Sequence, residues 1–227
     1  MPPILAIVIA ATALLFQVVS IRAAQGPSTP TEASLEAEFR QLRAKLGNMP
    51  EFSGSDAASK YRLAEELAHR GDMRGAIDMY RAAIHLKREW ADPYRGLGQV
   101  LLDHHEYAEA VQALQASIRF GRDDFQVFHW LGRAYMGKGD LPAAAAALVR
   151  ATELEPDDAE AFADLGLVCM AQGDAVGAEA ALTQSIRLKP DYAEAHQLRD
   201  QLTKIKGDPE QTRQAGQALF KNLFGRE

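Results

Sequence analysis

The feature that most constrains this chain is an internal period of 34 residues. Four blocks, 57–90, 91–124, 125–158 and 159–192, align without a gap. Leucine stands at the seventh position of each block, a small residue at the eighth and alanine at the twentieth. These residues are Leu63, Leu97, Leu131 and Leu165; Ala64, Gly98, Gly132 and Gly166; and Ala76, Ala110, Ala144 and Ala178. A period of this length predicts a solenoid, in which stacked units bury a shared core.

The repeated pattern resembles the tetratricopeptide repeat, whose signature is W-x-x-L-G-x-x-Y followed by spaced A, F, A and P. An aromatic residue fills its first slot in three blocks, at Tyr94, Phe128 and Phe162, whereas Lys60 stands in the first block. The resemblance covers 57–192. It implies an all-α fold, a right-handed superhelical α-solenoid of antiparallel helix pairs. The pattern also suits close helix packing, because small residues at positions 8, 20 and 27 let two helices approach.

The first 24 residues are predicted to form a separate segment. Residues 4–21 carry no charge, and as a helix they would reach ~27 Å, close to the ~30 Å of bilayer hydrocarbon. This favours a single-pass N-terminal membrane anchor over a cleaved signal segment, which would leave an exported, periplasmic protein. Arg22 on the C-terminal side favours a cytoplasmic soluble part, but one arginine leaves the side of the membrane open.

The remaining segments flank the repeats. Residues 25–56 are predicted to be a linker with a short amphipathic helix, 193–206 a capping helix, and 207–227 a C-terminal helix that begins at the N-cap Asp208. Leu219, Phe220, Leu223 and Phe224 form an apolar cluster on that last helix. Two interpretations remain open: the helix folds back onto the stack, or it docks onto a partner.

Nothing in the sequence supports catalysis. Nucleophile, phosphate-loop, dinucleotide and zinc-protease motifs do not occur, so we expect neither enzymatic activity nor a cofactor. The single cysteine, Cys169, excludes an intrachain disulfide, and its repeat position predicts a packed side chain. His104, His105 and Glu106 are adjacent at a turn, which is poor spacing for one metal ion. The formal net charge of −6 argues against nucleic acid as the main partner.

The resemblance implies a binding surface instead, because the first helices of tetratricopeptide repeats line a concave groove. We predict that a protein or peptide partner contacts residues at positions 5, 6, 9 and 12 of the blocks, together with position 2. The candidates are Tyr61, Arg62, Arg95, Gln99, Gln126, His129, Trp130, Arg133, Met136, Asp164, Leu167 and Met170. Aromatic, arginine and methionine side chains are enriched at protein interfaces. The lysine, asparagine and arginine series by which co-chaperones hold a peptide carboxylate does not occur at these positions.

The sequence therefore predicts a non-catalytic adaptor, tethered to a membrane and assisting a membrane-associated complex. Trp130 is the expected centre of its binding site, although the same side chain can instead tighten the stack. The alternative function is a structural scaffold, a homo-oligomer that self-associates through the apolar terminal helices.

Overall fold

The computed structural model describes residues 56–205 and 208–224, all of them helical or in short turns. Its helices are α3 (Ala57–His69), α4 (Met73–Leu86), α5 (Ala91–Asp103), α6 (Tyr107–Arg119), α7 (Phe125–Lys138), α8 (Leu141–Leu154), α9 (Ala159–Gln172), α10 (Ala175–Leu188), α11 (Ala193–Lys204) and α12 (Pro209–Phe224). The predicted anchor at 1–24 and the linker up to residue 55 lie outside the described residues. Among the helices that are described, none is long and apolar enough to span a bilayer.

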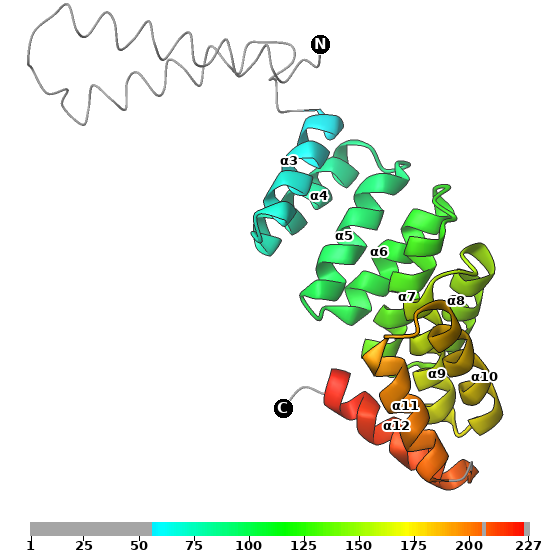
Figure 1. The fold of residues 1–227 in the computed structure, drawn as a ribbon. Helices are drawn as coiled ribbons and strands as arrows, with labels where there is room; N and C mark the ends of the chain where they lie inside the picture. Colours follow the sequence, from blue (N-terminus) through cyan, green and yellow to red (C-terminus); the bar gives the residue numbers. More distant parts are fainter. Residues whose placement is uncertain (1–55, 206–207, 225–227) are drawn as a thin grey trace, which may run out of the picture. The chain divides into compact units, whose positions relative to one another are not determined.

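Each 34-residue block holds one helix pair, and the pairs stack in chain order (Figure 1). The strongest packing is within pairs, α3 with α4 up to α9 with α10, and α4, α6 and α8 each also pack on the first helix of the next pair. The prediction of an all-α solenoid built from helix pairs is confirmed.

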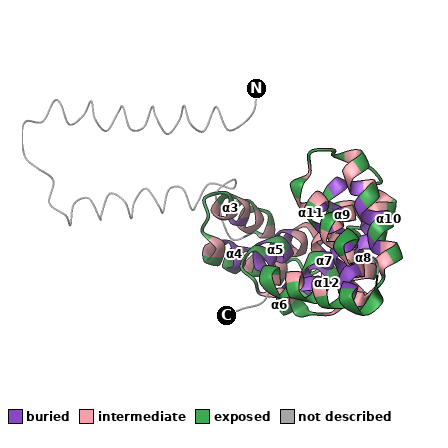
Figure 2. Ribbon diagram, turned by 60° about the horizontal axis from the view of Figure 1, so that its bottom comes forward, coloured by how far each residue is buried: buried purple, intermediate pink, exposed green. Residues whose placement is uncertain are grey.

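Within a pair, the glycine at position 8 lies against the leucine at position 24. A Cβ atom on Gly132 would lie 2.6 Å from Cγ of Leu148, and the pairs Gly98–Leu114 and Gly166–Leu182 are equally tight. All three leucines are fully buried. The core thus runs between the two helices of each pair, where Figure 2 shows the buried segments. The sequence alternates small and large residues at these positions because the helices approach so closely.

Aspartates begin most of the repeat helices. Asp56, Asp72, Asp124, Asp140, Asp158 and Asp174 each accept a hydrogen bond from the backbone N–H three residues later. These carboxylates satisfy a helix-end donor and interact favourably with the helix dipole. The turns within pairs need a left-handed residue, which is Gly71, Gly139 or Gly173 in three repeats and His105 (φ 62°) in the second. His105 lies beside Tyr107, whose hydroxyl is 2.8 Å from the ring Nδ1 atom.

Position 27 ties two helices together in the second and fourth repeats. The buried hydroxyl of Ser185 donates to the carbonyl oxygen of Ala159 at 2.7 Å, and Ser117 makes the matching bond to Ala91 at 3.1 Å. In the first and third repeats the residue is alanine (Ala83 and Ala151). The serines are therefore additions to a stack that packs without them.

We expect Ser185→Ala to lower the free energy of unfolding by about 1 kcal/mol, because one buried hydrogen bond is lost while the carbonyl keeps its helical partner. Urea denaturation followed by circular dichroism measures this. The exposed Thr183→Ala on the same helix is the control. An unchanged midpoint for Ser185→Ala would show that the bond contributes nothing.

The last two helices do not form a fifth repeat pair. α11 packs on α10 and buries Ala195, Leu198 and Leu202, as a capping helix would. α12 instead makes its main contact with α9, with a smaller contact to α7. Asp208 caps α12 as predicted, accepting a 2.8 Å hydrogen bond from the backbone N–H of Gln211. Of the two interpretations of the C-terminal helix, the structure shows the fold-back.

Candidate functional site

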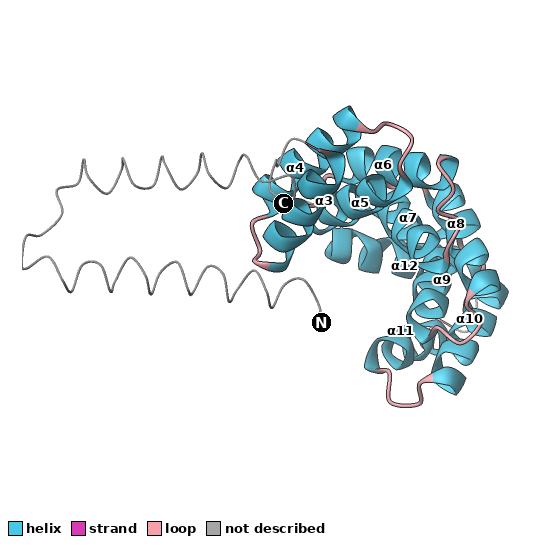
Figure 3. Ribbon diagram, turned by 90° about the horizontal axis from the view of Figure 1, so that it is seen from above, coloured by secondary structure: helices cyan, strands magenta, loops and turns pink. Residues whose placement is uncertain are grey.

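The concave side of the repeats is formed by their first helices. α3 contacts α5, α5 contacts α7 and α7 contacts α9, whereas no comparable contact joins successive second helices in the described part of the chain. Helices that approach one another on one side only must curve around that side, as the view from above shows (Figure 3). The predicted partner-binding residues lie on these first helices.

The structure divides the twelve predicted residues into two groups. Eight keep part of their side chain accessible: Tyr61, Arg62, Arg95, Gln99, Gln126, Trp130, Arg133 and Asp164. The other four are buried: His129, Met136, Leu167 and Met170. The prediction that any of these residues contacts a partner remains a prediction. What the structure adds is that the groove is accessible at one section and covered at another.

The covered section consists of Met136, Leu167, Met170 and Ala171, at the end of the groove where α12 lies. The first three belong to the same apolar cluster as Ala215, Leu219, Phe220 and Phe224 of α12. Sequence reasoning placed these methionines on an open groove because the helix that covers them comes from outside the repeat pattern.

The open section is an aromatic cluster around one arginine, formed by Tyr61, Trp90, Arg95 and Trp130. The Arg95 guanidinium lies 5.9 Å from the centre of the Trp130 ring, and the Tyr61 and Trp90 rings are 5.0 Å apart. A cation over an aromatic face is attracted by the ring quadrupole. Three first-helix positions and the residue before α5 thus converge from three successive repeats.

Two electrostatic features mark the open section. Partial burial, followed by the nearby Glu65 carboxylate, raises the pKa of the Tyr61 hydroxyl, which is therefore neutral at physiological pH. The Arg95 Nε atom is buried and has no hydrogen-bond partner within the described residues. A buried donor without a partner is uncommon in folded proteins.

Trp90 is the residue of this cluster that sequence reasoning missed. It stands at the last position of the first block, outside the groove positions of the repeat, and directly precedes α5. Its indole N–H donates to the Asp92 carboxylate at 3.0 Å, which fixes the ring beside Tyr61. The only signal in the sequence was that Trp90 is one of two tryptophans.

A polar contact separates the two sections. The buried His129 ring has its Nε2 atom 2.9 Å from the Asp164 carboxylate, and Arg133 Nε lies 3.8 Å from the same oxygen. His129 therefore joins α7 to α9 rather than facing a ligand.

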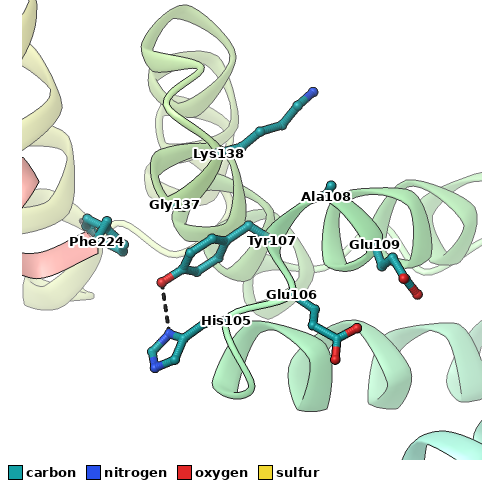
Figure 4. Close-up of a pocket in the computed structure, with 8 residues that line it drawn as sticks. All are labelled: His105, Glu106, Tyr107, Ala108, Glu109, Gly137, Lys138 and Phe224. Carbon is teal, nitrogen blue, oxygen red and sulfur yellow. Dashed lines mark hydrogen bonds between the residues drawn. The ribbon is translucent and has the colours of Figure 1, made fainter. Parts of the chain in front are cut away.

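One cavity of about 410 Å³ lies where α12 ends (Figure 4). Tyr107, Gly137 and Phe224 form its apolar wall, and Glu106, Glu109 and Lys138 supply charges around it. The Tyr107 and Phe224 ring centres are 6.2 Å apart, so α12 reaches the turn of the second repeat. His105 and Glu106 also border this cavity, but no three metal-binding side chains converge in the part of the chain that is described.

Cys169 packs between α9 and α10 in the predicted slot. Burial, together with the negative charge of Asp174, raises the pKa of its thiol to about 11. A raised pKa means less thiolate at any lower pH, and the thiolate is the reactive form.

We expect the native Cys169 thiol to react with iodoacetamide at about pH 8 roughly 100-fold more slowly than in the urea-unfolded chain, since its pKa lies about 2 units higher. The rate should rise about tenfold per pH unit up to pH ~11. Mass spectrometry of the alkylated chain gives both rates. A native rate equal to the unfolded rate would contradict the burial.

Comparisons with known proteins agree with this architecture. A crystal structure of MamA protein matches with 23% identity, a TM-score of 0.64, and coverage of 74% of this chain and 90% of that one. MamA residues 41 to the end from Desulfovibrio magneticus RS-1 match with 21% identity and a TM-score of 0.59, over 80% of this chain and 97% of that one. The structure of YrrB, described as a tetratricopeptide repeat protein with an unusual peptide-binding site, gives 21% identity and a TM-score of 0.59, over 77% and 97%.

At these identities the matches show the fold alone. No curated protein matches the chain significantly. A family model does: residues 14–218 match the model for the C-terminal domain of cilia and flagella-associated protein 70. The match takes in all four repeats, α11 and most of α12. The chain therefore belongs to this family of tetratricopeptide repeat proteins.

Proposed function

We propose that the chain is a non-catalytic adaptor that binds a protein or peptide segment at the open section of its concave groove. The observation that carries this proposal is the cluster of Tyr61, Trp90, Arg95 and Trp130, with a buried Arg95 N–H that has no acceptor among the described residues. Tyrosine, tryptophan and arginine are the residue types that dominate interface energies. The tetratricopeptide repeat fold is one that typically serves protein–protein interaction, and YrrB supports peptide binding by analogy.

Selection of random displayed peptides on the full-length chain tests this proposal. Peptides that occupy the open section should slow hydrogen exchange in the parts of α3, α5 and α7 that carry the cluster, and Arg95→Ala should abolish their binding. Arg187→Ala, on the exposed side of α10, is the control and should leave binding unchanged. Protection confined to the second helices α4, α6 and α8 would place the binding site elsewhere.

The tether is a second part of the proposal and rests on residues 4–21, which carry no charge. We infer that this segment anchors the protein in a membrane, beside a complex that it helps to assemble; export after cleavage is the alternative. Carbonate extraction of membranes, with Ile7→Asp and Leu14→Asp introduced together, distinguishes them. An anchored chain stays in the membrane pellet and the double variant leaves it, whereas a cleaved chain is soluble in both cases and lacks its first residues by mass.

Self-association through the terminal helices has less support. The apolar residues of α12 pack against α9 of the same chain, and of its four large apolar side chains Leu223 alone is mostly exposed, at 55%. An adaptor therefore accounts better for these contacts than a scaffold.

A further inference from the structure

α12 lies on α9 in the way that a bound amphipathic helix lies in a groove. Its inward residues follow helical spacing: Thr212, Ala215, Gly216, Leu219, Phe220 and Phe224. The outward positions, such as Gln214, Gln217 and Lys221, are exposed. One face thus carries the apolar contacts, which is the anchor pattern by which helical ligands enter apolar grooves.

Gly216 is the point of closest approach. A Cβ atom there would lie 2.3 Å from the backbone N of Ala171 and 2.4 Å from the carbonyl carbon of Met170. Backbone atoms cannot turn away as a side chain can, so any larger residue at this position must lift α12 off α9. The covered section therefore selects a helix with glycine at the crossing point.

A basic side chain one turn earlier matches the end of α9. Arg213 lies beside Gly173, where α9 ends, and its Nε atom donates to the carbonyl oxygen of Gln172 at 3.4 Å. The carbonyl end of a helix carries partial negative charge, which favours a cation. Arg213, Gly216, Leu219 and Phe220 are thus the residues by which α12 fits the covered section.

The contact that holds α12 leaves part of its apolar surface accessible. Only Thr212 and Gly216 are fully buried on this helix of 16 residues, whereas each repeat helix from α4 to α10 buries four or more. Leu219, Phe220 and Phe224 keep part of their surface accessible. These partly accessible apolar side chains are the ones that a helix of the same pattern from another protein would replace.

From this geometry we infer that the covered section is a second ligand site of the groove, and that α12 is its tethered occupant. The ligand is an amphipathic helix of a partner protein with a basic residue three positions before a glycine and large apolar residues three, four and eight positions after it. The inference deepens the proposed function, since it concerns the same groove, but it uses different residues from the open section.

A labelled peptide of residues 208–224 tests the site with a known probe. A short tether holds α12 at a millimolar effective concentration, so the wild-type full-length chain should bind the peptide about 100-fold more weakly than a chain whose α12 cannot dock. Gly216→Leu supplies that chain, because leucine keeps helix propensity high while blocking the crossing point. Fluorescence anisotropy measures both affinities.

Matched variants separate the crossing point from general effects. Gln217→Leu adds the same side chain one residue away, at an exposed position, and should leave the peptide affinity as low as in wild type. The peptide carrying Gly216→Leu should bind none of the chains, and a chain ending at Ile205 should bind the unaltered peptide as tightly as the Gly216→Leu chain does.

Three outcomes would overturn the inference. Equal, weak peptide binding by wild-type and Gly216→Leu chains would show that the covered section is no helix site. Loss of repeat structure in both the Gly216→Leu and the shortened chain would make α12 a permanent part of the fold. A wild-type dimer that Gly216→Leu dissociates would make a second copy the occupant.

The proposed function at the open section can be tested independently of the helix site under α12. Trp130→Ala should remove peptides bound at the open section while leaving the α12 peptide affinity of the Gly216→Leu chain unchanged. A chain that binds the α12 peptide but no peptide at the open section would keep this inference and refute the proposed adaptor site.

Discussion

Leu148→Ala lowers the free energy of unfolding by about 2–5 kcal/mol, because it removes a fully buried side chain from the centre of the third repeat. Gly132→Ala alone should also destabilise, by about 1–2 kcal/mol, since its new methyl group meets Leu148. In the Leu148→Ala background, Gly132→Ala should instead raise the free energy of unfolding. Alanine then fills vacated space and gains about 1 kcal/mol of helix propensity over glycine. Urea denaturation of the four chains completes the cycle.

The control for this cycle uses the same residue types in different repeats. Leu182 faces Gly166 rather than Gly132, so Gly132→Ala and Leu182→Ala should be additive within about 0.5 kcal/mol. Additivity in the Gly132–Leu148 pair as well would mean that the close approach of the two helices is not what requires glycine at position 8.

Trp130→Ala should weaken a peptide bound at the open section by roughly 100-fold, the size expected for the central aromatic residue of an interface. Its cost to the free energy of unfolding should be smaller, about 1–2 kcal/mol, because the ring is only partly buried and packs at the edge of the core. Calorimetric titration and urea denaturation of the same variant give the two values. We expect this difference because the accessible part of the Trp130 ring, beside Arg95, is the surface that the peptide would contact.

Two further variants sharpen the test. Trp130→Phe retains a ring under Arg95 and should lose much less affinity. Val149→Ala shortens an exposed apolar side chain on α8 and should change neither value appreciably. A large loss of stability in Trp130→Ala with peptide binding intact would show that Trp130 stabilises the packing of the repeats and does not bind the peptide.

The repeat fold was predictable because the residues that define a helix pair lie within one 34-residue block, and the pattern occurs in four blocks. The glycine at position 8 packs against the leucine at position 24 of the same block. Their spacing in the sequence therefore identifies the helix pair. His105 shows how much the stack tolerates, since it adopts the left-handed conformation that glycine has in the other turns. Such departures are small compared with the packing that surrounds them.

The binding surface was only partly predictable, because part of it depends on contacts outside the period. Met136, Leu167 and Met170 stand at groove positions, yet they are covered by α12, which begins 39 residues after Met170. Trp90 joins the open section from a position that the repeat pattern assigns to a loop. Arg95 and Trp130, in contrast, lie where the repeat register places them, since their helices are fixed by the stack itself.

The contact between Phe224 and Tyr107 has a consequence for how the repeats lose their structure. In an ordinary solenoid each repeat contacts only its neighbours, so the terminal repeats at both ends unfold with similar ease. Here the last turn of α12 reaches back to the start of α6, after crossing α9 and approaching α7. We therefore expect the second, third and fourth repeats to open together, whereas the first repeat, among the described helices, packs only on the second. Transient opening should thus begin at α3 and α4, and the end of the molecule nearest the N-terminal segment is the part that exchanges with solvent first.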